Sequence, residues 1–291
     1  MSPSSRPRPR ARKPPPPNWA LDWFVTLFTQ MDHAVKLLDL STRGISVLRA
    51  MPRVIEVLAN GESPSDPEQT KKELEFANEQ ASLAQKEVDE GFPLLHSQAT
   101  VSLWADLEHA VRTLLASWLN HDSSSRSLEP VRKLKVFLGD YESLDPAERS
   151  YYILDRLELE SRHRRGVERF EHLLATFGFE TRLNKDVKRT LLELYHVRNV
   201  LVHRRGFADR IIVEACPWLA LSVGQQVVVT EKHYRAYFDA VSHYSFTVLI
   251  RVFLRFGFSR SELTPEDLTS VAFSSAPPSV PPQDEDAESA G

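Results

Sequence analysis

The sequence contains a single cysteine, Cys216, among its 291 residues. One cysteine cannot form an intrachain disulfide and cannot by itself build a thiolate metal site, so both kinds of cross-link are excluded. A lack of structural disulfides is typical of proteins that work in the reducing cytoplasm. We therefore predict a cytoplasmic protein in which Cys216 is a small buried apolar residue and not a nucleophile.

Long uninterrupted hydrophobic runs are also missing. The most apolar stretch, residues 246–258, is broken by Arg251 and Arg255 and is too short to span a bilayer. The basic residues near the N-terminus alternate with prolines and are not followed directly by an apolar segment, so we do not expect them to form a secretion signal. We therefore expect no membrane segment and no membrane partner.

The chain also lacks a strong excess of charge of one sign. It has 36 lysines and arginines against 40 acidic residues, and its formal net charge is −4. This balance argues against nucleic-acid binding through bulk positive charge, but it is compatible with a local basic cleft. With 42% hydrophobic and 26% charged residues, the composition is that of an ordinary globular protein of one large or two small domains.

Composition divides the chain into two tails and two helical regions. Residues 1–17 are rich in proline and basic side chains, and residues 259–291 are rich in serine, proline and acidic side chains, so we expect both tails to be disordered. Between them the apolar residues recur at helical spacing. We predict an all-α fold, with an N-terminal helical region at 18–92 and a larger helical domain at 93–258.

The expected helices are placed by their apolar periodicity, their caps and their breakers. A helix begins near Asn18, and a second helical segment at about 45–58 is bent or broken at Pro52. A charged helix follows at about 67–90. The strongest helix begins at Pro93. Its continuous apolar face consists of Leu103, Leu107, Val111, Leu114 and Trp118.

Further helices are expected at about 129–138, 146–177, 185–203 and 231–257. Residues 210–230 contain two short runs of β-branched residues. We therefore expect a small extended pair or an irregular loop there, as the only departure from helical structure.

One segment near the end of the helix expected at 185–203 is chemically distinctive. It reads Arg198-Asn199-Val200-Leu201-Val202-His203. Arg198 lies on the apolar stripe of that helix. A guanidinium cannot lose its charge there, so it needs an anion or an acidic partner.

A polar row lies beside this stripe. His196, Asn199 and His203 are spaced three and four residues apart and therefore share one face of the helix. Arg198 and His203 diverge by about 140° on an ideal helix. They can meet at one small ligand only if the last turn loosens or a second copy of the chain contributes to the site.

The arrangement of Arg198, Asn199 and His203 resembles the R-x4–6-H signature of the HEPN superfamily, whose ribonuclease members favour a polar residue after the arginine. The resemblance covers roughly residues 93–257. Three surrounding stretches resemble uncharacterised bacterial members of the superfamily: residues 197–206, 103–108 and 223–225.

The resemblance implies a HEPN-like helical bundle that dimerises through the motif helices, so that two motifs face one cleft. It also implies a metal-independent endoribonuclease, a hydrolase of the toxin–antitoxin or antiviral type, that needs no cofactor. Arg198 would hold phosphate, His203 would act as general acid or base, and Asn199 would orient either of them. We expect RNA as substrate and an antitoxin or other regulatory partner, because an unrestrained ribonuclease is toxic.

Other interpretations of these residues stay open. Arg198 pairs either with phosphate or with a buried carboxylate, for which Glu108, Asp106 and Glu193 are candidates. Glu108 is either a supporting partner of Arg198 or a solvated flanking residue. His196 is expected to be a bystander on the polar face.

Arg204 and Arg205 either support the site or lie where the helix dipole favours cations. As a whole, the domain is alternatively a catalytically silent HEPN module that binds RNA, a nucleotide or a protein, or a helical scaffold. No metal site is predicted, because the histidines lack acidic or cysteine companions at ligand spacing.

Overall fold

We describe the fold from a computed structural model, which describes residues 13–61, 67–160, 164–180 and 182–264, together with Leu268 and Val271. Of the two tails predicted to be disordered, 1–17 and 259–291, residues 1–12, 265–267, 269–270 and 272–291 lie outside the described residues. The described residues 259–264 contain a capped 3-10 turn at Arg260–Glu262, which corrects the predicted start of the second tail. The all-α fold is confirmed. The described chain consists of helices, turns and loops, and its one β contact is an isolated bridge between Phe207 and Gln226.

The long helices are α1 (Asp22–Leu48), α3 (Pro67–Glu90), α4 (Pro93–His121), α9 (Lys185–His203) and α11 (Glu231–Arg255). The shorter helices are α2 (Met51–Gly61), α5 (Glu129–Arg132), α6 (Leu138–Ser143), α7 (Pro146–Glu160), α8 (Val167–Thr176) and α10 (Arg210–Ala215). Single 3-10 turns are η1 (Asn18–Ala20), η2 (Ser123–Ser127), η3 (Pro217–Leu219) and η4 (Arg260–Glu262). No helix within the described ranges combines the length and the apolar character needed to cross a membrane.

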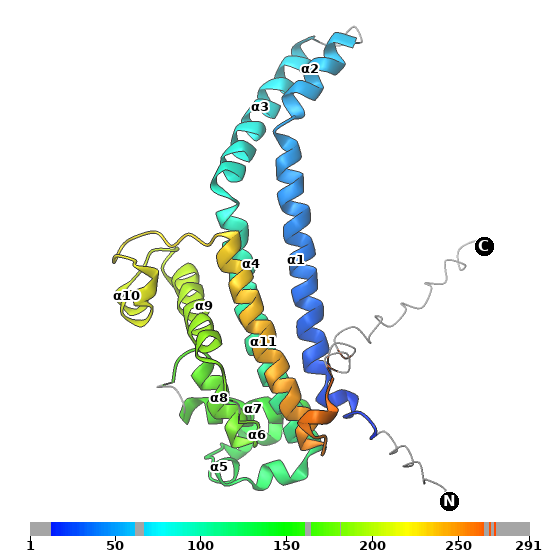
Figure 1. The fold of residues 1–291 in the computed structure, drawn as a ribbon, viewed down its shortest axis with the longest axis vertical. Helices are drawn as coiled ribbons and strands as arrows, with labels where there is room; N and C mark the ends of the chain where they lie inside the picture. Colours follow the sequence, from blue (N-terminus) through cyan, green and yellow to red (C-terminus); the bar gives the residue numbers. More distant parts are fainter. Residues whose placement is uncertain are drawn as a thin grey trace, which may run out of the picture.

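α4 is the central helix of the body, and α1, α7, α9 and α11 pack against it (Figure 1). Its predicted apolar face is confirmed, since each of the five residues is at most 5% exposed. Burial of five such side chains contributes on the order of 10 kcal/mol to folding. The Trp104 ring also contacts the rings of Phe170 and Tyr195, at centroid distances of 5.2 and 5.3 Å, and so holds α8 and α9 against α4.

The first turns of α1 belong to the same core. Trp23 and Phe24 are at most 1% exposed, and Phe24 lies against Phe246 of α11 with ring centroids 5.1 Å apart. The rest of α1 continues into α2, and α3 returns along both helices to α4, so that these helices form an arm that projects from the body (Figure 1). The break expected near Pro52 is confirmed, because α1 ends at Leu48 and α2 begins at Met51.

Two of the predicted helices are interrupted. The helix predicted over 146–177 is two helices, α7 and α8, and Gly166 at the start of α8 has a φ of 57° that is not helical. The side chain of Tyr195 lies 3.4 Å from where a Cβ at this glycine would be, so α9 approaches closely there. The helix predicted over 129–138 is likewise wrong, because α5 and α6 are separated by the non-helical residues 133–137.

The β-branched run at 210–214 is helical and not extended. The carboxylate of Asp209 accepts a hydrogen bond from the amide of Ile212 at 3.1 Å and so caps α10. Ile212 is 1% exposed, and capping together with burial outweighs its preference for strands. The second β-branched run, at 226–230, is irregular and extended. It pairs with the turn after α9, where the amide of Val227 donates a hydrogen bond to the carbonyl of Gly206 at 2.8 Å.

Candidate functional site

α9 has the predicted boundaries, and both of its ends are set by local interactions. The side chain of Asn184 caps its first turn. After His203 the chain passes through two residues with left-handed backbone, Arg205 at φ 53° and Gly206 at φ 82°. The glycine was expected there. This turn folds the following loop back against the motif.

A pocket of about 460 Å³ opens beside the last two turns of α9. It is lined by Arg165, Tyr195, His196, Asn199, Val200, His203, Arg204, Asp209 and Ile211. These residues come from α9, from the loop before α8 and from the segment that begins α10. The prediction that His196, Asn199 and His203 share one face is therefore confirmed.

His196 is buried, which corrects its expected place as a bystander on the polar face. It is 4% exposed, and its ring lies edge-on to that of Tyr195 with centroids 5.0 Å apart. Burial lowers the pKa of His196, the positive charge of Arg165 lowers it further, and the negative charge of Asp209 opposes the shift. The imidazole is therefore neutral at neutral pH.

This lowered pKa predicts a dependence of stability on pH. As the pH falls below about 6.5, the unfolded state binds a proton at His196 that the folded state does not, so the free energy of unfolding decreases. We expect His196→Gln to reduce this decrease. Urea unfolding near pH 7.5 and near pH 5.5 measures it, with the exposed His33→Gln as control. Equal pH dependence in wild type and His196→Gln would contradict the prediction.

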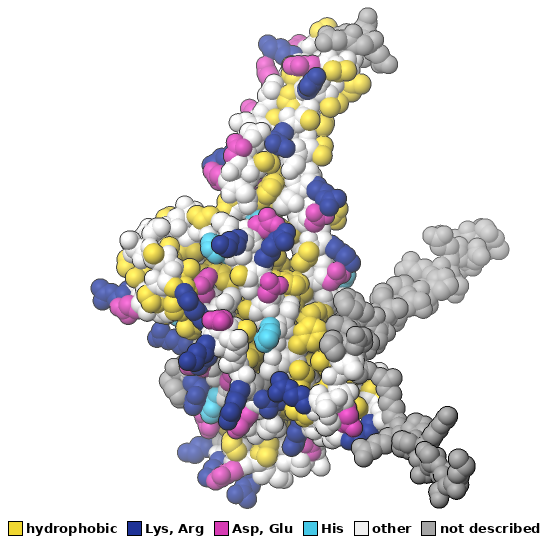
Figure 2. Space-filling view, in the orientation of Figure 1, with side chains coloured by type: hydrophobic (Ala, Val, Ile, Leu, Met, Phe, Trp, Pro, Cys, Tyr) yellow, Lys and Arg dark blue, Asp and Glu magenta, His cyan; other side chains and the backbone are white. Residues whose placement is uncertain are grey.

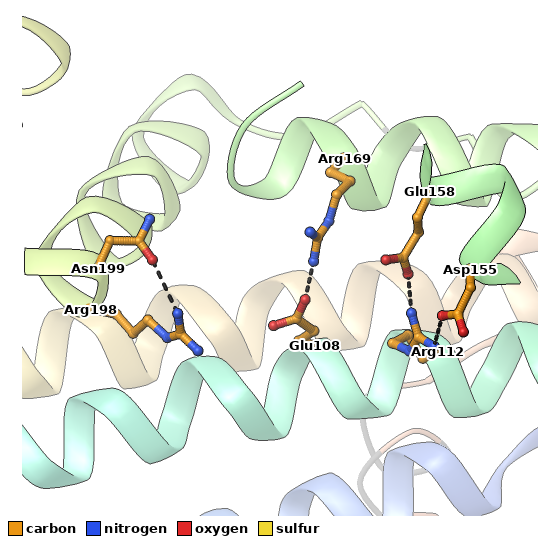
Figure 3. Close-up of polar contacts among 7 residues, drawn as sticks. All are labelled: Glu108, Arg112, Asp155, Glu158, Arg169, Arg198 and Asn199. Atoms are coloured by element: carbon orange, nitrogen blue, oxygen red, sulfur yellow. Dashed lines mark hydrogen bonds and ion pairs between the residues drawn. The ribbon is translucent and has the colours of Figure 1, made fainter. Parts of the chain in front are cut away.

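Arg198 is not among the residues that line the pocket. Its Nη1 donates a hydrogen bond to Oδ1 of Asn199 at 3.1 Å, and its Nε is buried without a hydrogen-bond partner among the described residues (Figure 3). Arg198 therefore reaches the pocket through Asn199, while His203 lines it directly. This separation agrees with the angle of about 140° between the two positions on the helix.

Glu108 does not support Arg198. It forms an ion pair with Arg169 of α8, and the two side chains point toward each other between α4 and α8 (Figure 3). Both side chains are 30% exposed. The interaction joins two helices of the body and leaves the guanidinium of Arg198 without this carboxylate.

The two other candidate carboxylates are also engaged elsewhere. Glu193 accepts a hydrogen bond from the hydroxyl of Tyr237 at 2.8 Å, and Asp106 accepts one from Ser102 at 3.2 Å. Burial raises the pKa of Asp106, which the hydrogen bond from Ser102 partly opposes. Within the described ranges Arg198 thus has no carboxylate partner, and the scaffold interpretation loses its expected ion pair.

Arg204 and Arg205, the two arginines that follow the motif, line different parts of the surface. Arg204 lines the pocket, and its Nε lies 3.4 Å from Oδ2 of Asp209. Arg205 instead lines a different groove, which it shares with Leu201 and Val228. Of the two predicted supporting arginines, the structure therefore brings only Arg204 to the site.

A second pocket, of about 530 Å³, continues the first along α7 and α8 and shares Arg165 and Tyr195 with it. Its other lining residues are Tyr152, Asp155, Arg156, Glu158, Leu159, Arg164 and Arg169. Both of its carboxylates pair with Arg112 (Figure 3). Arg164 and Arg165 are exposed and form no ion pair with another described residue. Figure 2 shows lysine and arginine side chains gathered over this part of the body.

Arg165 and Tyr195 were missed by the sequence analysis. The adjacent Arg164-Arg165-Gly166 is a visible signal, since paired cations before a glycine are typical of an exposed turn. Its proximity to the motif is not visible, because α8 must first fold against α9.

Cys216 is confirmed as a buried residue, with 1% exposure. Burial raises the pKa of its thiol to about 12, so the thiolate form is scarce at neutral pH. Among the described residues, no three His, Cys, Asp or Glu side chains gather in a way that would hold a metal ion.

Comparison of the chain with family models, with curated proteins and with solved structures finds no match in any of the three.

Proposed function

We propose that the protein is a metal-independent endoribonuclease of the HEPN type that acts at the pocket beside α9. One observation carries the proposal. The pocket combines two imidazoles, His196 and His203, with the amide of Asn199 and with the guanidinium groups of Arg165 and Arg204. These are the groups that cleavage of a phosphodiester requires.

The chemistry uses the 2′-hydroxyl of RNA as nucleophile. His196, kept neutral by its lowered pKa, accepts the proton of this hydroxyl as its oxygen attacks phosphorus. The bond from phosphorus to the 5′-oxygen breaks, and His203 donates a proton to the leaving oxygen. The guanidinium of Arg204 or Arg165 stabilises the charge on phosphorus. The products are a 2′,3′-cyclic phosphate and a 5′-hydroxyl.

Arg198 is in this proposal a positioning residue within one chain, because it holds the amide of Asn199. A homodimer through the motif helices would add a second set of motif residues to the cleft. Exposed apolar side chains beside the pocket support such an interface: Val202 is 47%, Phe207 49% and Ile211 46% exposed.

The second pocket would hold RNA that flanks the scissile phosphate. Arg164 and Arg165 offer guanidinium groups to phosphates, and the rings of Tyr152 and Tyr195 offer surfaces on which bases stack. Such contacts depend on backbone and stacking and not on base edges. They therefore predict binding to single-stranded RNA with little sequence preference.

An active ribonuclease of this kind would act as a toxin or as an antiviral or stress effector. It would need a restraining partner in the cytoplasm, such as an antitoxin. The exposed rim of the pocket at His203 and Arg204 is where such a partner would block the site most directly.

A second candidate function is a catalytically silent module that binds RNA or a nucleotide. It is favoured by one observation, namely that the motif arginine lies outside the pocket in the single chain. In this case Arg165 and Arg204 would hold phosphate, and no bond would break.

Cleavage of RNA in the presence of EDTA tests the proposal. We expect the full-length protein to cut a single-stranded RNA and to leave intact the same strand with a 2′-deoxyribose at the cut site, because the nucleophile is then missing. Gel electrophoresis measures cleavage, and mass spectrometry identifies the cyclic phosphate. Bound but uncut RNA would favour the silent module. Cleavage that requires a divalent metal ion would contradict both the metal-independent ribonuclease and the silent module.

A further inference from the structure

The outer face of the arm carries an apolar stripe that faces solvent. Its large side chains are between 36% and 67% exposed: Leu37, Leu40, Val47, Leu48, Met51, Val54 and Leu58. Figure 2 shows hydrophobic side chains in a band along the arm. A continuous patch of this kind is unusual on a monomer and marks an interaction site.

The spacing of the stripe is that of a helix-packing seam. Positions 37, 40, 44, 47, 51, 54 and 58 alternate steps of three and four residues, which is the pattern of a coiled coil. Position 44 of this seam is the exposed Gly44, and Leu48 lies beside the seam. The opposite face of α1 is the one that packs on α3 and α4, and it carries residues such as Met31 and Leu38. A helix with apolar residues on two faces is expected where helices pack against it from both sides.

The stripe continues across the break between α1 and α2. The amide of Ala50 donates to the carbonyl of Val47 at 2.9 Å, and the amide of Val54 donates to the carbonyl of Ala50 at 3.2 Å. The helical turn is thus nearly preserved. The stripe runs for about 33 Å at 1.5 Å per residue.

No described segment of the chain covers this stripe, since its large side chains are exposed. The residues outside the described ranges include few large apolar side chains, namely Met1, Phe273 and Val280. A stripe about 33 Å long needs a partner with a comparable row of apolar residues. The same stripe on a second copy has the matching length and spacing.

The apolar area is sufficient for a specific dimer. At a little over half exposure, the seven side chains leave about 400 Å² of apolar surface on each copy. Apolar atoms make up about 60% of an interface, so the total buried area would be about 1,300 Å². Specific dimers bury at least about 1,200 Å².

We propose that the arm is a self-association surface, in which α1 and α2 of one chain pack against α1 and α2 of a second copy. With α3 of each chain behind them, the two arms form a four-helix bundle. This interface is separate from the pocket, and it does not depend on the proposed ribonuclease activity.

Disulfide cross-linking of the full-length protein tests the arrangement directly. Val47 is the middle of the seven seam positions, with 37, 40 and 44 before it and 51, 54 and 58 after it, so it meets Val47 of the second copy whether the arms run parallel or antiparallel. The native Cys216 is 1% exposed and does not compete. We expect Val47→Cys to give a covalent dimer on mild oxidation. The control is Arg53→Cys, an exposed position about 120° around the helix from Val47.

Sedimentation equilibrium gives an independent measurement. We expect the double variant Leu40→Glu, Val54→Glu to weaken self-association at least tenfold. The matched control, Val136→Glu with Leu138→Glu, places the same charges at exposed apolar positions off the arm and should leave association unchanged. The proposal is overturned by equal cross-linking of Val47→Cys and Arg53→Cys, by unchanged association of the arm variant, or by a monomeric wild type. Circular dichroism verifies that each variant is folded.

Discussion

Replacing His203 with alanine is expected to lower the rate of RNA cleavage by about 10²- to 10⁴-fold, the usual contribution of a general acid or base. His203 lies at the end of α9 and lines the pocket, where its imidazole can reach a bound phosphodiester. Its side chain is exposed and forms no hydrogen bond with another described residue. The substitution should therefore leave the free energy of unfolding within about 0.5 kcal/mol of wild type.

Single-turnover cleavage of a labelled RNA in EDTA measures this effect, together with urea unfolding of the same preparation. His33→Ala is the matched control, because His33 is an exposed histidine of α1 that does not line the pocket. We expect it to cleave like wild type. Equal cleavage by wild type and His203→Ala would show that the catalytic proposal is wrong, and it would leave the silent binding module.

Replacing Arg198 with methionine is expected to change activity and stability in opposite directions. The variant loses the hydrogen bond from Nη1 to Asn199, so the amide is free to rotate in the pocket. We expect cleavage to fall about tenfold or more. The variant also removes the buried Nε that has no hydrogen-bond partner among the described residues. Methionine keeps most of the side-chain volume, so the free energy of unfolding should rise by about 1 kcal/mol.

Arg169→Met supplies the contrast to Arg198→Met. Arg169 forms an ion pair with Glu108, and its removal leaves that carboxylate partly buried without its partner. We expect this variant to be less stable than wild type and its cleavage to be less affected. Urea unfolding of both variants measures whether the free energy of unfolding rises for Arg198→Met and falls for Arg169→Met. If Arg198→Met destabilises the protein as Arg169→Met does, Arg198 has a structural role that the proposal does not include.

The helices that the sequence predicts well are those with strong local signals. The face of α4 from Leu103 to Trp118 has a helical period over sixteen positions, and every one of its five members is buried. α9 begins after the cap at Asn184 and ends before Gly206, as expected. Periodicity and capping act within a few residues of each other, so the chain itself contains this information.

The predictions that failed depend on contacts between distant segments. The long helix expected over 146–177 is interrupted before Gly166, where Tyr195 of α9 leaves little space. The extended run expected at 210–214 is helical, because Ile212 is buried against the body. In both places packing outweighs the local preference of the chain.

The sequence likewise predicts only part of the candidate site. Its core is a helical row, and the sequence alone places His196, Asn199 and His203 on one face, because α-helix geometry determines which residues are neighbours. The sequence also indicates that Arg198 lies on a different face of α9 from His203. Only the tertiary structure decides that His196 is buried, that Glu108 pairs with Arg169, and that Arg165 joins the pocket from the loop before α8. These outcomes depend on how α4, α8 and α9 pack, and helix packing is set by the shapes of surfaces that lie far apart in the chain.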